Sequence, residues 1–134
     1  MGKTLTNVKM WNILDEDKIE RREILPVEVK AQIDNGATGV VIPEKLAREL
    51  RLRKSGTTKV RYADERIEER EVVVGLRIGI MGRNSECRAI VEPRRTIPLI
   101  GQIILEDLDL WIDSKNAKLI PNPESPDMPL LDEL

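Results

Sequence analysis

Apolar and polar residues alternate along several short stretches of this chain, and such alternation is typical of β-strands with one buried face. The clearest stretch runs from Leu25 to Ile33, and Val40-Val41-Ile42 resumes a strand after a break. By the same criterion, further strands are predicted at residues 8–11, 58–62, 67–74, 76–81, 87–91, 97–100 and 110–112 with 117–120.

Helical spacing of apolar residues occurs in only two places. Residues 44–50 follow Pro43, which a first helical turn tolerates, and they place Leu46, Ala47 and Leu50 on one face. Residues 102–108 predict a second short helix, whose inward residues are expected to be Ile103, Ile104, Leu105 and Leu108.

Many short strands, two short helices and no internal repeat favour an all-β barrel over an α/β sheet. The strands at 58–62 and 67–74 are too polar to be central and predict a projecting hairpin. The largely ionic segment from Asp15 to Arg22 is expected to be a solvated, mobile turn or hairpin tip. We expect one domain over residues 1–122, followed by a Pro-rich tail over 123–134 that is extended or disordered.

Composition narrows the chemistry that such a barrel can support. The chain has 134 residues, no His, one Cys and a formal net charge of -2. Without His it cannot assemble a Ser-His-Asp or Cys-His nucleophile, or the usual His/Cys zinc site. Aromatic residues make up 2% and Phe is absent, so base-stacking surfaces for nucleic acid are unsupported. If the chain is an enzyme, carboxylates are the expected acids and bases.

Other features of the sequence point to no additional chemistry. Cys87 has no His partner and is interpreted as a small packing residue. The glycines at 75, 79 and 82 lack the spacing of a phosphate loop and are interpreted as strand punctuation. Nothing near the start resembles a signal sequence, and no run approaches the roughly 20 apolar residues of a membrane span. We therefore expect a cytoplasmic protein with no membrane partner.

The string Asp34-Asn35-Gly36-Ala37-Thr38 lies between two predicted strands. An Asp-x-Gly turn that closes an apolar strand can hold one carboxylate rigidly in a groove, so Asp34 is the candidate catalytic residue and the other four complete its loop. By itself Asp-Asn-Gly is also ordinary turn chemistry, because all three residue types favour turns.

Several landmarks in order resemble the retropepsin-like aspartic proteases, which are single-domain relatives of retroviral proteases. The resemblance covers roughly residues 27–123. The landmarks are Asp34 to Thr38, Val41-Ile42-Pro43, the helix from Leu46 to Leu52, a hairpin with Tyr62-Ala63-Asp64, and Pro98-Leu99-Ile100-Gly101 before a helix.

The resemblance implies a small closed acid-protease barrel with a flap hairpin and one or two short helices. It makes Asp34 catalytic and places Ile100 and Gly101 behind the active-site loop as its support. It implies neither a metal nor a cofactor. The residues that it assigns to the flap, which closes over substrate, are Tyr62, Ala63, Asp64 and Glu65.

Only one Asp-x-Gly is present, so the resemblance implies a homodimer that brings together Asp34 from each of two subunits. The pair would activate a water that hydrolyses a peptide or protein substrate. Two like charges in contact cannot both ionise, as aspartic proteases illustrate as a class, so a bell-shaped pH–rate profile on the acidic side is expected. No nucleic-acid partner is implied.

Two residues depart from the family pattern. Asn35 stands where the family has Thr or Ser, whose hydroxyl braces the two catalytic loops across the dimer. Two interpretations stay open: an unusual working brace, or a weakened or inactive dimer that serves as a peptide-binding or scaffolding module. Glu65 stands where the family often has Gly, and Glu tolerates positive φ less well. Tyr62 is expected to pack on the barrel rim, and Trp11 and Trp111 to be core or dimer-contact residues.

Overall fold

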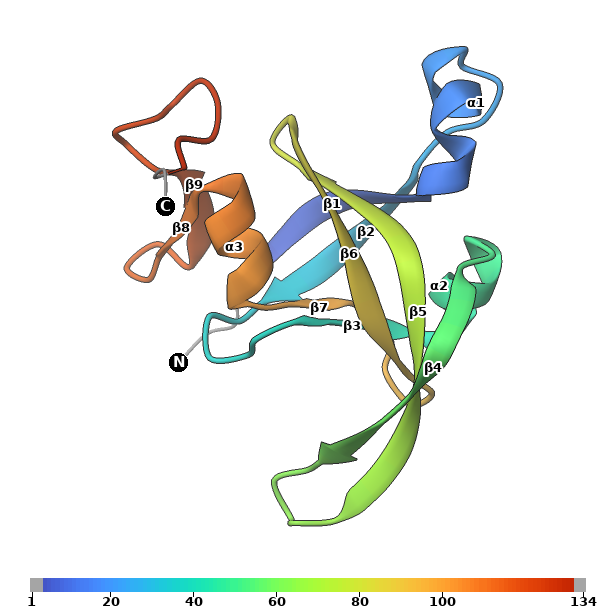
Figure 1. The fold of residues 1–134 in the computed structure, drawn as a ribbon. Helices are drawn as coiled ribbons and strands as arrows, with labels where there is room; N and C mark the ends of the chain where they lie inside the picture. The colour runs from blue at the N-terminus through green and yellow to red at the C-terminus, as the bar shows by residue number, and fades with distance from the viewer. Residues whose placement is uncertain (1–3, 132–134) are drawn as a thin grey trace.

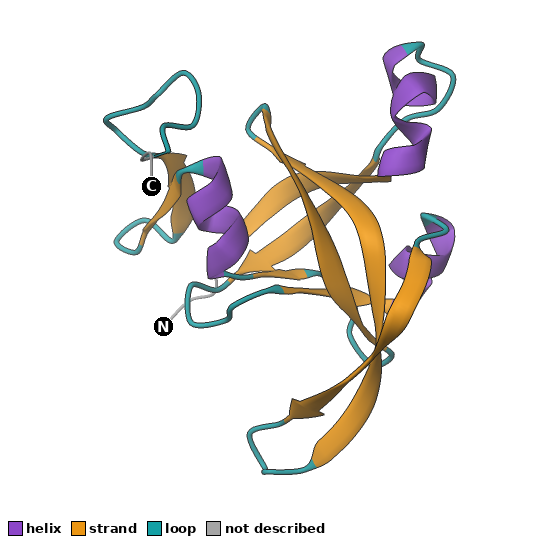
Figure 2. Cartoon of the chain, viewed as in Figure 1, coloured by secondary structure: helices purple, strands orange, loops and turns teal. Residues whose placement is uncertain are grey.

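The computed structural model describes residues 4–131, and strands predominate in it over short helices (Figures 1 and 2). In chain order the elements are β1 (Thr4–Asn12), the 3-10 helix η1 (Ile13–Asp15), α1 (Glu16–Glu20), β2 (Val27–Ile33), β3 (Val40–Pro43), α2 (Glu44–Glu49), β4 (Arg53–Arg61), β5 (Ile67–Ile80), β6 (Arg83–Glu92), β7 (Leu99–Ile100), α3 (Gln102–Leu108), β8 (Leu110–Asp113) and β9 (Lys118–Pro121).

The strands close into a barrel. Neighbouring strands follow the order β1-β2-β7-β3-β6-β5, and β5 also pairs with β1, which completes the ring. Closure leaves no free edges within the ring, and β4 is attached outside it, along β5. The predicted all-β closed barrel is therefore confirmed. Its interior is filled by apolar side chains, and the largest fully buried ones include Met10, Ile42, Leu76, Ile78, Ile80, Ile100, Ile104 and Leu108.

The β4–β5 hairpin projects past the barrel, at the bottom of Figure 1. The sequence predicts two strands, at 67–74 and 76–81, but the structure has one continuous strand, β5. Gly75 has φ +79°, and the pairing with β6 is irregular between Val73 and Leu76. A bulge of this kind bends a strand without ending it. One strand therefore forms both an arm of the hairpin and a wall of the barrel.

The charged segment from Asp15 to Arg22 is largely exposed, as predicted, but residues 16–20 form the helix α1, so the predicted turn or hairpin tip is wrong there. Glu16 and Asp17 lie in the first turn of α1, where acidic side chains favour a helix. Glu16 also fastens α1 to the barrel, because its carboxylate accepts hydrogen bonds from Trp11 Nε1 at 3.0 Å and Arg77 Nε at 2.6 Å. The Arg77 bond lowers the pKa of Glu16.

Helix α3 lies where predicted, but one of its four expected inward residues points outward. Ile104, Leu105 and Leu108 are buried, whereas Ile103 is 54% exposed. Successive helical residues are about 100° apart, so a face that contains Ile104, Leu105 and Leu108 turns Ile103 away from the core.

The chain that follows β9 is held against the end of α3. The Asp109 carboxylate accepts hydrogen bonds from the Asn122 side chain, the Ser125 hydroxyl and the Leu130 N–H. Arg83, which is 5% exposed, donates to the main-chain carbonyls of Asp109 at 2.9 Å and Ser125 at 2.5 Å. These contacts fix a segment, residues 122–131, that has turns and bends but no helix or strand. The domain boundary at residue 122 stays a prediction, and residues 132–134 lie outside the described range.

Among the helices described, none is both long enough and apolar enough to cross a membrane.

We predict that Asp109→Asn weakens the attachment of this segment in a pH-dependent way. Hydrogen bonds from Ser125, Asn122 and Leu130 hold the pKa of the Asp109 carboxyl below its ordinary value of 3.8. A lowered pKa stabilises the folded state above pH 3.8, and that contribution is lost as the pH falls through the folded-state pKa. Thermal melts should show a lower Tm for the variant at neutral pH and a difference that shrinks in strong acid.

Asp127→Asn, which changes an exposed carboxylate in the same segment, is the matched control and should follow the parent at every pH. A Tm difference for Asp109→Asn that does not vary with pH would contradict the prediction.

Candidate active site

Asp34 directly follows β2, and its backbone is fixed on both sides. Its N–H donates to the Ile100 carbonyl at 3.0 Å, and its carbonyl accepts from the Ala37 N–H at 3.2 Å. Its side-chain Oδ1 accepts from the Gly36 N–H at 2.8 Å. Asp34 is half-buried as a residue, and its carboxylate is oriented by the backbone of its own loop.

Gly36 leaves room for this carboxylate. A Cβ on Gly36 would lie 3.1 Å from Asp34 Oδ1, tighter than most real Cβ contacts. Gly36 is not among the glycines with positive φ, so the loop uses the small size of this residue and not left-handed backbone freedom.

The start of α3 supports the loop from behind. Consecutive N–H groups of Gly101–Ile103 donate to the carbonyls of Gly39, Ala37 and Thr38 at 2.7 to 3.0 Å. The first N–H groups of a helix have no partners within the helix, and the loop supplies them here. The loop and the helix therefore satisfy each other's backbone groups.

Gly101 allows this close approach. A Cβ at Gly101 would lie 2.5 Å from the Gly39 carbonyl oxygen and 2.6 Å from that of Ala37. Ile100, just before it, is fully buried. The structure thus places both residues behind the loop, and their role in activity stays a prediction. Sequence reasoning missed Gln102 and Ile103 as loop contacts, although a helix that begins directly after the landmark glycine must find acceptors for its first N–H groups.

Asn35 lies at the exposed end of the loop. Within residues 4–131, its side chain makes no hydrogen bond, so its amide has both a donor and an acceptor available.

The tip of the β4–β5 hairpin is a tight turn. The Tyr62 N–H donates to the Arg66 carbonyl at 2.9 Å, and the Glu65 N–H donates to the Tyr62 carbonyl at 2.8 Å. Glu65 adopts φ +67°, the left-handed conformation that glycine accepts most easily. Asp64 Oδ1 accepts from the Arg66 N–H, while Ala63 is exposed. The tip therefore closes with Glu in a position that suits Gly.

Tyr62 turns from the tip toward the barrel. Its hydroxyl donates to Glu92 Oε2 at 2.5 Å, and the Arg66 guanidinium lies 4.6 Å from the centre of its ring. Burial and the hydrogen bond to Glu92 raise the pKa of the Tyr62 phenol. The sequence does not indicate this contact of Glu92, because no local pattern distinguishes Glu92 from the other carboxylates of the chain.

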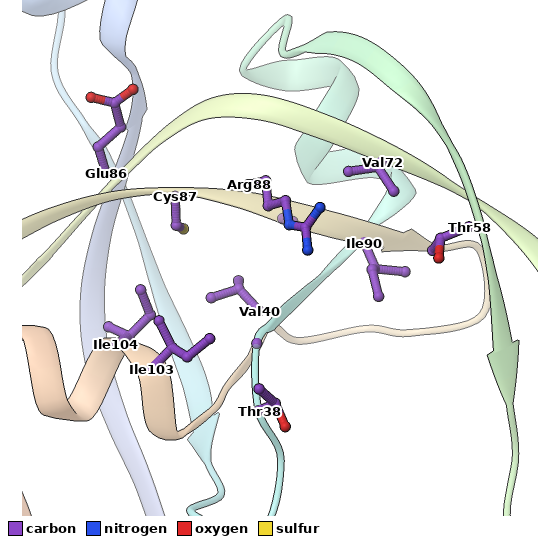
Figure 3. Close-up of a pocket in the computed structure, with 12 residues that line it drawn as sticks. Thr38, Val40, Thr58, Val72, Glu86, Cys87, Arg88, Ile90, Ile103 and Ile104 are labelled. Carbon is purple, nitrogen blue, oxygen red and sulfur yellow. The ribbon is translucent and has the colours of Figure 1, made fainter.

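A pocket of about 470 Å³ lies beside the Asp34 loop (Figure 3). Its lining joins Thr38 of the loop, Thr58 of β4, Arg88 of β6 and Ile103 of α3. Within the described chain, no hydrogen bond or ion pair links residues 62–65 to Asp34. The structure thus brings the loop together with the body of the hairpin, and not with its tip.

Cys87 also lines this pocket. Burial raises the pKa of its thiol to about 12, and the charges of Glu86 and Asp107 add to the effect. The thiol is therefore protonated at neutral pH, as a packing residue should be. In the part of the chain that the structure describes, no group of three or more His, Cys, Asp or Glu side chains could hold a metal ion.

The aspartyl protease family model matches residues 23–105 of the sequence. This chain belongs to the aspartyl protease family. The matched part contains the Asp34 loop, the β4–β5 hairpin and the start of α3, whereas β8 and β9 of this family member lie beyond it. A search of curated proteins found no match.

We predict that Gly101→Ala disrupts the Asp34 loop. The new methyl group would meet backbone carbonyls that cannot move without breaking their hydrogen bonds to α3. Overpacking of this kind should lower the free energy of unfolding by about 2 kcal/mol or more, measured by chemical denaturation.

Gly39→Ala is the matched control, because nothing lies within 4 Å of a Cβ at that position in the same loop. It should stay within about 0.5 kcal/mol of the parent. Equal stability of the two variants would show that the contact at Gly101 does not constrain the loop.

Proposed function

We propose that the protein is an aspartic endopeptidase in which each of two identical subunits contributes Asp34. The observation that carries the proposal is the single carboxylate that the backbone of its own loop orients through the Gly36 N–H. Membership of the aspartyl protease family supports the same chemistry. No second Asp-x-Gly occurs in the sequence, so one chain supplies half of the required pair.

In the proposed reaction, one Asp34 carboxylate accepts a proton from water while the water oxygen attacks the peptide carbonyl carbon. The protonated Asp34 of the second subunit donates a hydrogen bond to the developing oxyanion. Collapse of the tetrahedral intermediate breaks the C–N bond, and the leaving amine takes up a proton from the pair. The Gly36 N–H donates to Oδ1, whereas Oδ2 accepts no hydrogen bond within residues 4–131, so Oδ2 is the proposed acceptor of the water proton.

The rest of the proposed site follows from the same arrangement. Asn35 is exposed, and its amide is proposed to brace the two loops across the dimer. The β4–β5 hairpin is proposed as the flap, with Tyr62 and Glu65 at its tip. The pocket between Thr38, Thr58 and Ile103 is proposed to hold an apolar side chain of the peptide substrate. A reducing compartment such as the cytoplasm suits the free thiol in the chain.

A second function is favoured by one specific observation. Asn35 carries a longer, planar amide where the family pattern has a small hydroxyl, so the two loops of a dimer could be held too far apart for catalysis. The dimer would then bind peptides without cutting them, as a peptide-binding or scaffolding module.

We predict that the parent protein cleaves an unfolded protein or a mixed peptide library between acidic and neutral pH, and that Asp34→Asn does not. Removing the only proton acceptor should lower kcat by about three orders of magnitude or more. Asp17→Asn, on the exposed face of α1, is the control and should match the parent. If neither the parent nor Asp34→Asn cleaves any peptide and both still bind peptides, the binding module is favoured over the endopeptidase.

We also predict that Asn35→Thr strengthens the dimer, because a short hydroxyl can donate and accept across a two-fold axis. Sedimentation should show a lower dimer dissociation constant, and cleavage at low protein concentration should rise with it. Cleavage by a chain that stays monomeric at every concentration would overturn the two-subunit mechanism.

A further inference from the structure

Glu92 joins the barrel to the projecting hairpin. It is the last residue of β6 and is in register with Pro43 of β3, so its backbone belongs to the barrel wall. Each oxygen of its carboxylate accepts a hydrogen bond from the hairpin. Tyr62 donates its hydroxyl to Oε2 at 2.5 Å, and Arg70 donates Nε to Oε1 at 2.9 Å.

The two donors come from opposite sides of the hairpin. Tyr62 directly follows β4, whereas Arg70 lies within β5. One carboxylate therefore holds both sides of the hairpin at one point on the barrel, which restricts the angle of the hairpin more than a contact to either strand alone. We call these three side chains, Tyr62, Arg70 and Glu92, the flap clamp.

The flap clamp is sheltered from water. The Arg70 and Glu92 side chains are only 17% and 16% exposed. The Arg70 guanidinium also lies 5.6 Å from the centre of the Tyr62 ring. By contrast, the Lys54–Glu71 pair of the same hairpin has side chains 56% and 44% exposed at a separation of 4.0 Å. Exposed pairs contribute little. Arg70 also contacts Glu68 Oε2, whose side chain is 36% exposed, so Glu92 is the more sheltered of its two carboxylate partners.

The flap clamp lies where the hairpin leaves the barrel, because Val72 of β5 pairs with Ile90 of β6 and Arg70 and Glu92 are two residues further along these strands. The pairing of β4 with β5 is irregular between Lys54 and Gly56, opposite Val72 and Val73. The pairing of β5 with β6 is irregular between Val73 and Leu76, around Gly75. Both irregularities lie on the barrel side of the flap clamp, and bulges of this kind bend a strand. Beyond Val72, β4 and β5 form a two-stranded arm that needs a further contact to hold one orientation.

We propose that Glu92 is a positioning residue of the flap, whose carboxylate sets the angle of the hairpin on the barrel and must release Tyr62 and Arg70 before the hairpin can move. The proposal rests on the proposed function only in treating the hairpin as a flap. It assigns a role to a carboxylate that does not touch the reacting atoms.

The contact itself can be tested through Tyr62, which is the only tyrosine in the chain. Its phenol can be titrated by ultraviolet absorbance without interference from another tyrosine. Burial and then the Glu92 carboxylate raise its pKa above the ordinary value of 10.0, while Arg70 lowers it. Glu92→Gln removes the negative charge, so the phenol should ionise at lower pH than in the parent.

The position of the hairpin can be measured by spin-label distances. Asp64→Cys at the tip and Lys9→Cys on β1 supply two exposed labelling positions in a Cys87→Ser background. With labelled subunits diluted in excess unlabelled protein, so that distances within one subunit dominate, the parent should give one narrow distance distribution and Glu92→Gln a broad one. Glu69→Gln, which neutralises an exposed carboxylate of β5, is the matched control and should leave the distribution narrow.

Tyr62→Phe is the second variant, because it removes one hydroxyl and keeps the aromatic ring. It should broaden the distribution less than Glu92→Gln, and the double variant should fall short of the sum, since both changes break one network. A folded Glu92→Gln protein with the narrow distribution of the parent would overturn the proposal. If Glu92→Gln does not fold, an unchanged distribution in Tyr62→Phe would overturn it equally.

These distances are measured without substrate, so they do not depend on cleavage. If Glu92→Gln gives a broad distance distribution but the parent protein cuts no peptide, the flap clamp is supported and the proposed endopeptidase is not. In an active protein, Glu92→Gln should raise KM several-fold with a smaller change in kcat, since only flap placement is altered. Cleavage with unchanged KM and unchanged distances would support the endopeptidase and reject the flap clamp.

Discussion

The candidate site depends on the backbone contact between the Asp34 loop and the residues that begin α3, from Gly101 to Ile103. The loop has carbonyl groups that face inward, and the first turn of α3 has N–H groups without partners in the helix. Each set satisfies the other, and the fit is possible because residue 101 has no side chain. Parallel pairing of Ile33 with Ile100 extends this contact into the barrel, so the direction of the Asp34 carboxylate is tied to the core.

Much of the fold follows from local pattern. Alternation identifies the strands of the barrel, helical spacing identifies α2 and α3, and a polar pair of strands identifies the projecting hairpin. The Asp34 loop and the Ile100-Gly101 segment are also visible in the sequence, because Asp, Asn and Gly have strong turn preferences and because two apolar residues before Gly end a strand. These signals involve residues that are close together along the chain.

The errors come from contacts between distant residues. Gly75 alone cannot show whether a strand ends or bulges, because the answer depends on its partners in β6. The sequence of α1 resembles that of a solvated turn, because the hydrogen bonds from Trp11 and Arg77 that attach its Glu16 to the barrel come from outside the helix. Glu92 contacts side chains 22 and 30 residues away, and nothing around it in the sequence indicates either contact. Long-range hydrogen bonds of polar residues leave no periodic signal.

Strand β5 runs without a break through two parts of the molecule that have different roles. Its first half is an arm of the projecting hairpin, and its second half is a wall of the barrel. Because the side chains of a strand alternate, a one-residue insertion near Gly75 would turn the residues on one side of it to the opposite face. Lengthening the turn at residues 62–66 changes the reach of the arm and leaves the wall intact. Changes in chain length during evolution are therefore expected to gather at that turn, while the middle of β5 keeps a fixed length.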